Sequence, residues 1–171
     1  MEDTDKILEN IAGLMALAAR TAPKAKGTDN LIIRIFKKDE LPELSRNMQK
    51  AGKETARPRT FERDSENVLS ASCVLVAATR KSSLGLDCGF CGLSSCGEAD
   101  EQNITCAYNS GDLGIAAGSA VSRATDLRAD NRIMYTIGYT VKKLNLLGEP
   151  VAMALGIPLS GTGKNPFFDR K

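Results

Sequence analysis

Four of the five cysteines in this 171-residue chain lie within nineteen residues, from Cys88 to Cys106. Their separations are two, four and nine intervening residues, while the fifth cysteine, Cys73, lies apart in an apolar run. Thiolates are soft donors, and four of them in one loop form a tetrahedral set that suits zinc or an iron–sulfur cluster. The clustering therefore predicts an inorganic site formed by Cys88, Cys91, Cys96 and Cys106.

The spacing leaves the identity of this inorganic group open. Four-cysteine zinc sites usually present two C-x-x-C pairs, and this loop contains one, formed by Cys88 and Cys91. The cysteine sulfurs attached to the corners of an iron–sulfur cube lie farther apart than those attached to one ion, so a cluster tolerates uneven spacing better. We expect an iron–sulfur cluster. The alternatives are a single zinc or iron ion, or thiols that are only reactive or structural.

The surroundings of the cysteines are acidic. No basic residue occurs between Lys81 and Arg123. The acidic residues of this stretch are Asp87, Glu98, Asp100, Glu101 and Asp112. Negative surroundings disfavour the addition of an electron, so a cluster here is expected to have a low reduction potential and to attract a basic redox partner protein. The alternative is that Glu98, Asp100 and Glu101 are solvated loop residues.

Two residue types are missing from the chain, and each absence excludes a class of function. Histidine is absent, which excludes Ser-His-Asp and Cys-His nucleophilic catalysis and every zinc site that contains histidine. Tryptophan is also absent, and eight other aromatic residues offer little material for stacking nucleic-acid bases. The net charge of +2 adds no attraction to nucleic acid or to a membrane surface. We therefore expect no nucleic-acid or membrane partner.

Localisation is predicted from the N-terminus and the cysteine count. No apolar run approaches the roughly 20 residues that span a bilayer, and the first five residues are acidic, unlike the basic start of a secretory signal. An odd number of cysteines without an export signal favours a reducing compartment over a disulfide framework. The protein is expected to be cytoplasmic.

The hydrophobic pattern predicts alternating helices and strands in a single domain over residues 1–171. In the first half we expect a helix over 4–20, a strand over 31–36, a helix from after Asp39 to about 54, a short helix over 61–70 and a strand over 72–78. In the second half we expect a helix capped by Asp112 and running to about 127, a strand over 133–137, a helix over 139–147, a strand over 151–155 and an irregular tail from 156.

This order predicts a layered α/β or α+β domain, with a cysteine-rich loop over 84–111 inserted after the second strand. Cys73, in the middle of an apolar run, is expected to be a small core residue and not a ligand. The helix that follows the loop carries small residues on one face, which predicts that it packs closely at the centre of the fold. These residues are Gly114, Ala117, Gly118, Ala120, Val121 and Ala124.

The segment from Cys88 to Cys96 resembles the CGxCGxxxC signature of a small four-iron four-sulfur domain. In that domain the fourth cysteine lies farther along the chain and commonly precedes proline, whereas Cys106 precedes Ala107. The whole chain is similar to the uncharacterised ferredoxin domain-containing proteins of anaerobic bacteria and archaea, in this loop, in residues 109–116 and in residues 156–169. The resemblance implies a four-iron four-sulfur cluster held by the four cysteines.

Two other segments resemble flavin-dependent nitroreductases. Residues 18–25 resemble the end of a helix in those enzymes, and residues 114–129 and 156–158 resemble parts of their C-terminal half. Nitroreductases are intertwined homodimers that hold FMN at the subunit interface. The resemblance implies a nitroreductase-like layered sheet with flanking helices, a homodimer, and an FMN phosphate near Lys164, Arg170 and Arg20. The N-terminal arginine motif of those enzymes has no counterpart here, so the resemblance supports the fold more strongly than it supports flavin binding.

Together these features predict an iron–sulfur redox protein that transfers electrons, with a flavin or a bound partner as the candidate acceptor. One alternative is a structural or regulatory zinc- or iron-binding protein without redox activity, and another is an FMN-binding, nitroreductase-like flavoprotein. Whether the chain is itself an oxidoreductase is left open at this point.

Overall fold

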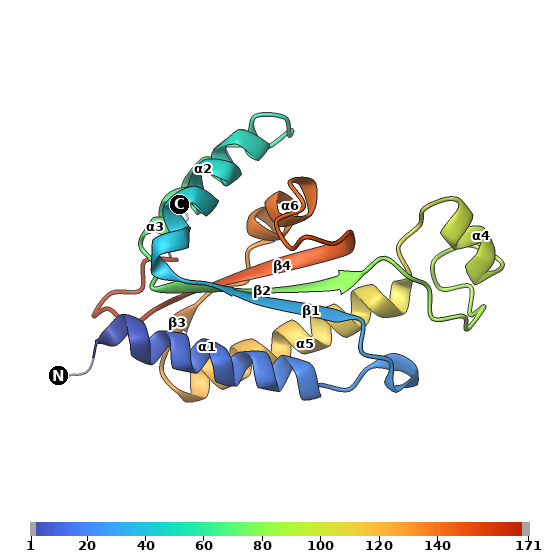
Figure 1. Ribbon diagram of the computed structural model, residues 1–171, viewed down its shortest axis with the longest axis horizontal. Coiled ribbons are helices and arrows are strands. Elements are labelled where there is room, and N and C mark those ends of the chain that lie inside the picture. The colour runs from blue at the N-terminus through green and yellow to red at the C-terminus, as the bar shows by residue number, and fades with distance from the viewer. Residues whose placement is uncertain (1–2, 169–171) are drawn as a thin grey trace.

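The computed structural model describes residues 3–168, which form a four-stranded antiparallel sheet with helices on both faces (Figure 1). The strand order is β1-β2-β4-β3. The strands are β1 (Leu31–Phe36), β2 (Cys73–Arg80), β3 (Asp130–Asn131) and β4 (Val151–Ser160). This arrangement confirms the predicted layered α+β class, and the cysteine-rich loop follows the second strand as expected.

The helices form two layers, one on each face of the sheet (Figure 1). One layer contains α1 (Thr4–Thr21) and α5 (Ala107–Asp126), and the other contains α2 (Leu41–Gly52), α3 (Pro58–Leu69) and α6 (Tyr135–Lys143). Two 3-10 turns, Ala25–Gly27 and Lys38–Glu40, flank β1. The short helix α4 (Cys96–Glu101) lies beyond the end of the sheet, in the cysteine loop. None of the helices in residues 3–168 combines the length and apolarity needed to cross a bilayer.

Strand β2 is the centre of the core because its side chains are buried on both faces of the sheet. Cys73, Leu75 and Ala77 belong to the hydrophobic cluster shared with α1 and α5, while Val74 and Val76 belong to the cluster shared with α2, α3 and α6. Alternate residues of a strand point to opposite faces, so a strand covered on both sides has an uninterrupted apolar sequence. This explains why the strand predicted over 72–78 contains an uninterrupted apolar run.

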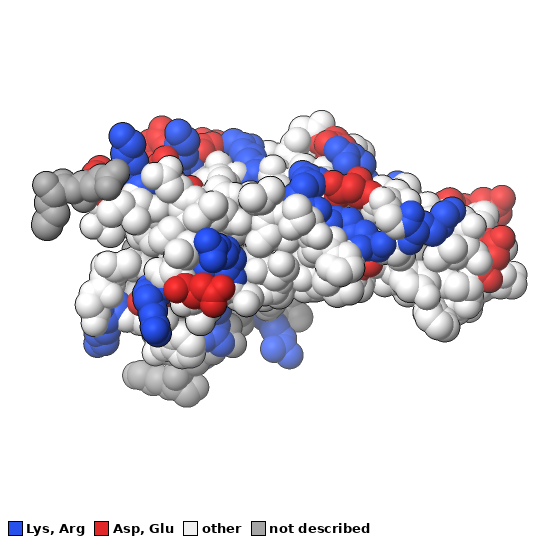
Figure 2. Space-filling model, turned by 90° about the horizontal axis from the view of Figure 1, so that it is seen from below, with Lys and Arg blue, Asp and Glu red and all other residues white. Residues whose placement is uncertain are grey.

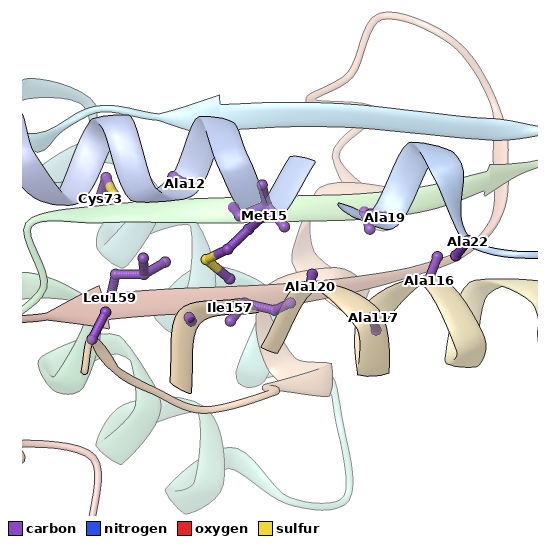
Figure 3. Close-up of a cluster of buried hydrophobic side chains, with 14 of the residues drawn as sticks. Ala12, Met15, Ala19, Ala22, Cys73, Ala116, Ala117, Ala120, Ile157 and Leu159 are labelled. Atoms are coloured by element: carbon purple, nitrogen blue, oxygen red, sulfur yellow. The ribbon is translucent and has the colours of Figure 1, made fainter. Parts of the chain in front are cut away.

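Helices α1 and α5 pack closely because many of the residues between them are alanine (Figure 3). Ala12 and Ala19 of α1 and Ala116 and Ala120 of α5 are fully buried in one cluster. The prediction of a tightly packed α5 is thereby confirmed for its alanines. Gly114 and Gly118, which were assigned to the same face, are exposed and have nothing within 4 Å of a Cβ placed on them.

A second close approach joins α6 to β4. A Cβ added to Gly138 would lie 1.7 Å from the carbonyl oxygen of Ala154, and one added to Gly156 would lie 2.3 Å from Cγ2 of Ile137. The space that a Cβ would need is therefore already occupied, by backbone atoms at Gly138 and by the buried Ile137 side chain at Gly156. The absence of a side chain at these two glycines lets the helix lie directly on the strand.

The predicted elements of the first half are confirmed, and several of the second half are wrong. Helix α5 begins at Ala107, so Asp112 does not cap it. Asp112 is buried inside the helix, and its carboxylate accepts from the backbone N–H of Ala25 at 3.0 and 3.2 Å. The sequence showed a good capping residue, but the contact that Asp112 makes is with a segment 87 positions away.

The predicted strand over 133–137 is also wrong. Only Asp130 and Asn131 form β3, Met134 makes an isolated bridge to Gly156, and α6 begins at Tyr135. The buried residues Met134, Ile137 and Val141 are spaced by three and four positions, which is a helical period that the short apolar run concealed.

Strand β4 continues well past the expected end at 155. It runs to Ser160 and pairs with β2 through Leu159, so residues 156–160 are not an irregular tail. Gly156 and Pro158 suggested irregular structure, but Ile157 and Leu159 are fully buried and fix this segment against the core.

Candidate cysteine centre

The cysteine loop lies at one end of the molecule, between the last residue of β2 and the first residue of α5 (Figure 1). Cys88 and Cys91 lie in a turn without regular structure, Cys96 is the first residue of α4, and Cys106 is the residue before α5. Gly89 and Gly92 have φ values of 72° and 87°, which only glycine adopts without strain. The backbone can therefore turn tightly between the first two cysteines.

All four cysteines of the loop line one pocket. The pocket also receives Leu93 and Ala99, whose side chains make part of its wall apolar. Cys73 is not part of it, because its side chain is fully buried in the core, where Sγ lies 3.6 Å from the carbonyl oxygen of Leu8. The fold thus brings together residues that span nineteen positions and separates them from the fifth cysteine.

The side-chain geometry differs from that of a single-ion site. In residues 3–168, no three cysteine, aspartate or glutamate side chains approach closely enough to enclose one metal ion. The cysteine sulfurs bound to a cluster lie farther apart than those bound to one ion, and cysteine thiolates are the usual donors to a cluster. In donor chemistry the four thiols fit a cluster and a four-cysteine zinc site alike, while their separation is larger than one ion requires.

Asp87 holds Cys96 in place through two reciprocal hydrogen bonds. The backbone N–H of Cys96 donates to Oδ1 of Asp87 at 2.6 Å, and the backbone N–H of Asp87 donates to Sγ of Cys96 at 3.4 Å. Amide donors to a ligand sulfur are among the interactions that tune a cluster. The sequence showed Asp87 only as one of several acids. Its contact with Cys96 depends on how the loop folds back, and no local pattern signals it.

Glu98 and Asp100 lie at the surface and also accept hydrogen bonds from nearby serines. Oε2 of Glu98 accepts from the hydroxyl of Ser94 at 2.8 Å and from its backbone N–H at 3.1 Å. These hydrogen bonds lower the pKa of Glu98. Oδ2 of Asp100 accepts from the hydroxyl of Ser83 at 2.8 Å. Glu98 thus joins the first turn of α4 to Ser94, and Asp100 joins the end of α4 to Ser83. Figure 2 shows acidic side chains at this end of the molecule.

Arg20, one of the three residues predicted to bind a flavin phosphate, is already engaged. Its guanidinium donates to Oδ2 of Asp29 at 2.7 Å and to the carbonyl oxygen of Leu31 at 2.8 Å. Burial is the largest single influence on the pKa of Asp29 and acts to raise it, but the hydrogen bonds from Arg20 and from the backbone N–H of Leu31, together with the positive charges of Arg20 and Lys24, lower the pKa on balance. Arg20 therefore joins the end of α1 to the start of β1.

Lys164 lies near the opposite end of α1 from Arg20. It follows β4 in the chain, and Gly161 of the same segment lies against Leu8, where an added Cβ would be 3.3 Å from Cδ1. Twelve helical residues separate Leu8 from Arg20, a distance of about 18 Å along the axis. The structure does not bring Arg20 and Lys164 together within one chain. Arg170, the third predicted residue, lies outside the described residues.

Comparison with known sequences identifies the family. A profile of the family described as "Uncharacterized protein containing a ferredoxin domain (DUF2148)" matches residues 102–170. An uncharacterized protein of Archaeoglobus fulgidus is 39% identical over 166 residues, which cover 92% of this chain and 88% of that protein. The chain belongs to this family of uncharacterized ferredoxin-domain proteins.

Comparison with solved structures identifies the fold. A nitroreductase with bound FMN from Desulfitobacterium hafniense is similar over 99% of this chain and 85% of its own, with a TM-score of 0.62 and 16% identity. Nitroreductase A from Vibrio parahaemolyticus is similar over 95% of this chain, with a TM-score of 0.61 and 14% identity, and the chain spans 62% of its length. The fold is nitroreductase-like, as the sequence resemblance implied.

Proposed function

We propose that this protein is a redox protein that transfers electrons through an iron–sulfur cluster held by Cys88, Cys91, Cys96 and Cys106. The observation that supports this most directly is the shared pocket of four cysteines drawn from a turn, from α4 and from the start of α5. The ferredoxin domain named in the family description supports the same class of cofactor. The resemblance of residues 88–96 to the CGxCGxxxC signature favours the four-iron four-sulfur type.

A bound cluster supplies one-electron transfer, and the residues around the pocket would set how readily this occurs. The backbone N–H of Asp87 points at the sulfur of Cys96, while the carboxylates of Glu98 and Asp100 lie on the adjoining turn. Cys88 is exposed, so the pocket is within reach of another molecule. A basic redox partner protein is the partner we propose, because the acidic end of the molecule attracts positive charge.

The test is the iron and acid-labile sulfide content of full-length protein purified without oxygen. We expect about four of each per chain and a brown colour that bleaches on reduction. Cys106→Ser is expected to lower the iron and sulfide content strongly, because it removes one corner ligand. Cys73→Ser is the matched control and is expected to keep the full content, because Cys73 lies in the core.

Three results would count against this proposal. Colourless protein with one zinc per chain would favour a structural or regulatory metal site without redox activity. Protein with neither metal nor sulfide would show that the four cysteines are thiols that bind no inorganic group. Unchanged iron and sulfide in Cys106→Ser would remove Cys106 from the ligand set.

A flavoprotein is the second candidate, and the fold favours it. The similar structures include nitroreductases described with bound FMN. In this chain a hollow of about 370 Å³ lies beside β3, next to Arg128 and Asn165. Because Arg20 and Lys164 are far apart in one chain, a phosphate site that uses both would need a second copy. Yellow protein that releases FMN on denaturation would support this candidate.

A further inference from the structure

A second pocket lies beside the cysteine loop and contains no cysteine. Its volume is about 310 Å³, and it lies where the ends of β2 and β4 meet the segment that leads from α4 to Cys106. Polar side chains reach it from three separate parts of the chain. They are Lys81, Asn103, Thr105, Lys142 and Asn145. Pockets of this size are at the lower end of those that bind small organic molecules.

The charge in this pocket is positive and lacks a close counter-charge. Among residues 3–168, no carboxylate lies within 4.0 Å of the ammonium group of Lys81 or of Lys142. Nζ of Lys142 donates one hydrogen bond, to the carbonyl oxygen of Ala152 at 2.6 Å. An ammonium group has three N–H donors, so two remain for a ligand. Asn103, Thr105 and Asn145 add neutral donors on the other sides.

The remaining wall of the pocket is apolar. Ile104, Pro150 and Val151 contribute hydrophobic surface next to the polar groups. A bare inorganic ion would leave this surface in contact with water. The combination of two ammonium groups with an apolar wall instead suits a ligand that has an anionic head and an organic body.

We propose that this pocket binds an organic phosphate monoester. A phosphate monoester carries a charge of about −1.5 to −2 at pH 7, which matches two lysines, whereas one carboxylate would leave one lysine uncompensated. Lysine binds phosphate as a compact point charge, and the amide and hydroxyl groups of the pocket can donate to the remaining phosphate oxygens. The organic part of the ligand lies against Ile104 and Pro150.

Isothermal titration of the full-length protein with phenyl phosphate tests this site. We expect saturable binding that is tighter than that of inorganic phosphate, which lacks the apolar body, and of phenylacetate, which carries a single negative charge. Lys81→Gln is expected to weaken binding of phenyl phosphate about tenfold, as the loss of one charge-assisted contact does. Lys53→Gln, at an exposed lysine after α2, is the matched control and is expected to bind like the wild type.

Lys81 is exposed, so the substitution leaves the core intact, and circular dichroism checks that the fold is kept. The proposal is overturned if phenyl phosphate shows no saturable heat, or if Lys81→Gln binds it as tightly as the wild type. Tighter binding of phenylacetate than of phenyl phosphate would show that the ligand class is wrong. The experiment measures binding and not electron transfer, so its result is independent of the iron and sulfide analysis.

Discussion

Cys73 and Cys88 show how strongly the position of a thiol determines its chemistry. Cys73 has no exposed surface, and burial raises the pKa of its thiol to about 12. Cys88 is exposed at the tip of the loop. Because the thiolate is the reactive form, Cys73 remains a protonated, inert thiol in the folded protein at every pH well below 12.

This difference predicts a labelling pattern. At pH 8 iodoacetamide is expected to leave Cys73 unmodified in the folded protein and to modify it after unfolding in urea, when its pKa returns toward 9.0. Peptide mass spectrometry measures this. Equal labelling of Cys73 with and without urea at pH 8 would show that the side chain is accessible.

Some residues of the candidate site could be predicted from the sequence, because cysteines that lie close together along the chain are recognisable as a set. All four of them line one pocket. The roles of Asp87 and Arg20 could not be predicted, because each depends on a partner that only the folded backbone supplies. An aspartate beside cysteines is equally consistent with a solvated carboxylate and with a hydrogen-bonding residue.

At the scale of elements, the contact between α6 and β4 depends on glycine. Gly138→Ala would place a Cβ 1.7 Å from the carbonyl oxygen of Ala154, which belongs to the backbone and cannot rotate away. We expect the free energy of unfolding to fall by about 3 kcal/mol, the cost of overpacking a rigid site. Urea unfolding followed by circular dichroism measures this change.

Gly13→Ala is the matched control for Gly138→Ala. Gly13 lies within α1 with nothing within 4 Å of an added Cβ, and alanine is favoured over glycine in a helix by up to about 1 kcal/mol. This variant is expected to be as stable as the wild type or slightly more stable. If Gly138→Ala unfolded at the same urea concentration as Gly13→Ala, the close packing of α6 on β4 would be refuted.

The same packing explains why the second half of the chain was harder to predict than the first. Helix α1 and strand β1 have clear periods in the sequence, and their bounds were found nearly to the residue. Helix α6 is short, and its glycine and its apolar residues serve contacts with a strand that follows it in the chain. In that segment tertiary packing decides the structure, and the local pattern does not.

At the scale of the whole molecule, no element of residues 3–168 covers the outer face of α1 and α5. Leu14, Leu17 and Ile115 are 42%, 59% and 50% exposed there. No charged residue occurs on α1 between Glu9 and Arg20, and the middle of this face in Figure 2 is mostly uncharged. We propose that a second copy of the chain covers this face, which would make the protein a homodimer.

Leu17→Lys is expected to weaken dimerisation about tenfold or more, because it places a charge in the centre of an apolar interface. Sedimentation equilibrium over a range of concentrations measures the dimer dissociation constant. Leu69→Lys is the control, since Leu69 is also 47% exposed but lies on α3, on the other side of the sheet. A monomeric wild type would show that no dimer forms. A dimer weakened by Leu69→Lys and not by Leu17→Lys would show that the subunits meet through another face.

The cysteine loop lies outside every hydrophobic cluster of the described residues. None of the three clusters includes a residue between 81 and 106, although β2, which precedes the loop, contributes to all three and α5, which follows it, contributes to the largest. The three clusters are therefore complete without a side chain from the loop. An inorganic group lost to oxidation would leave behind a folded scaffold with both attachment points in place, ready to be reloaded without passing through the unfolded chain.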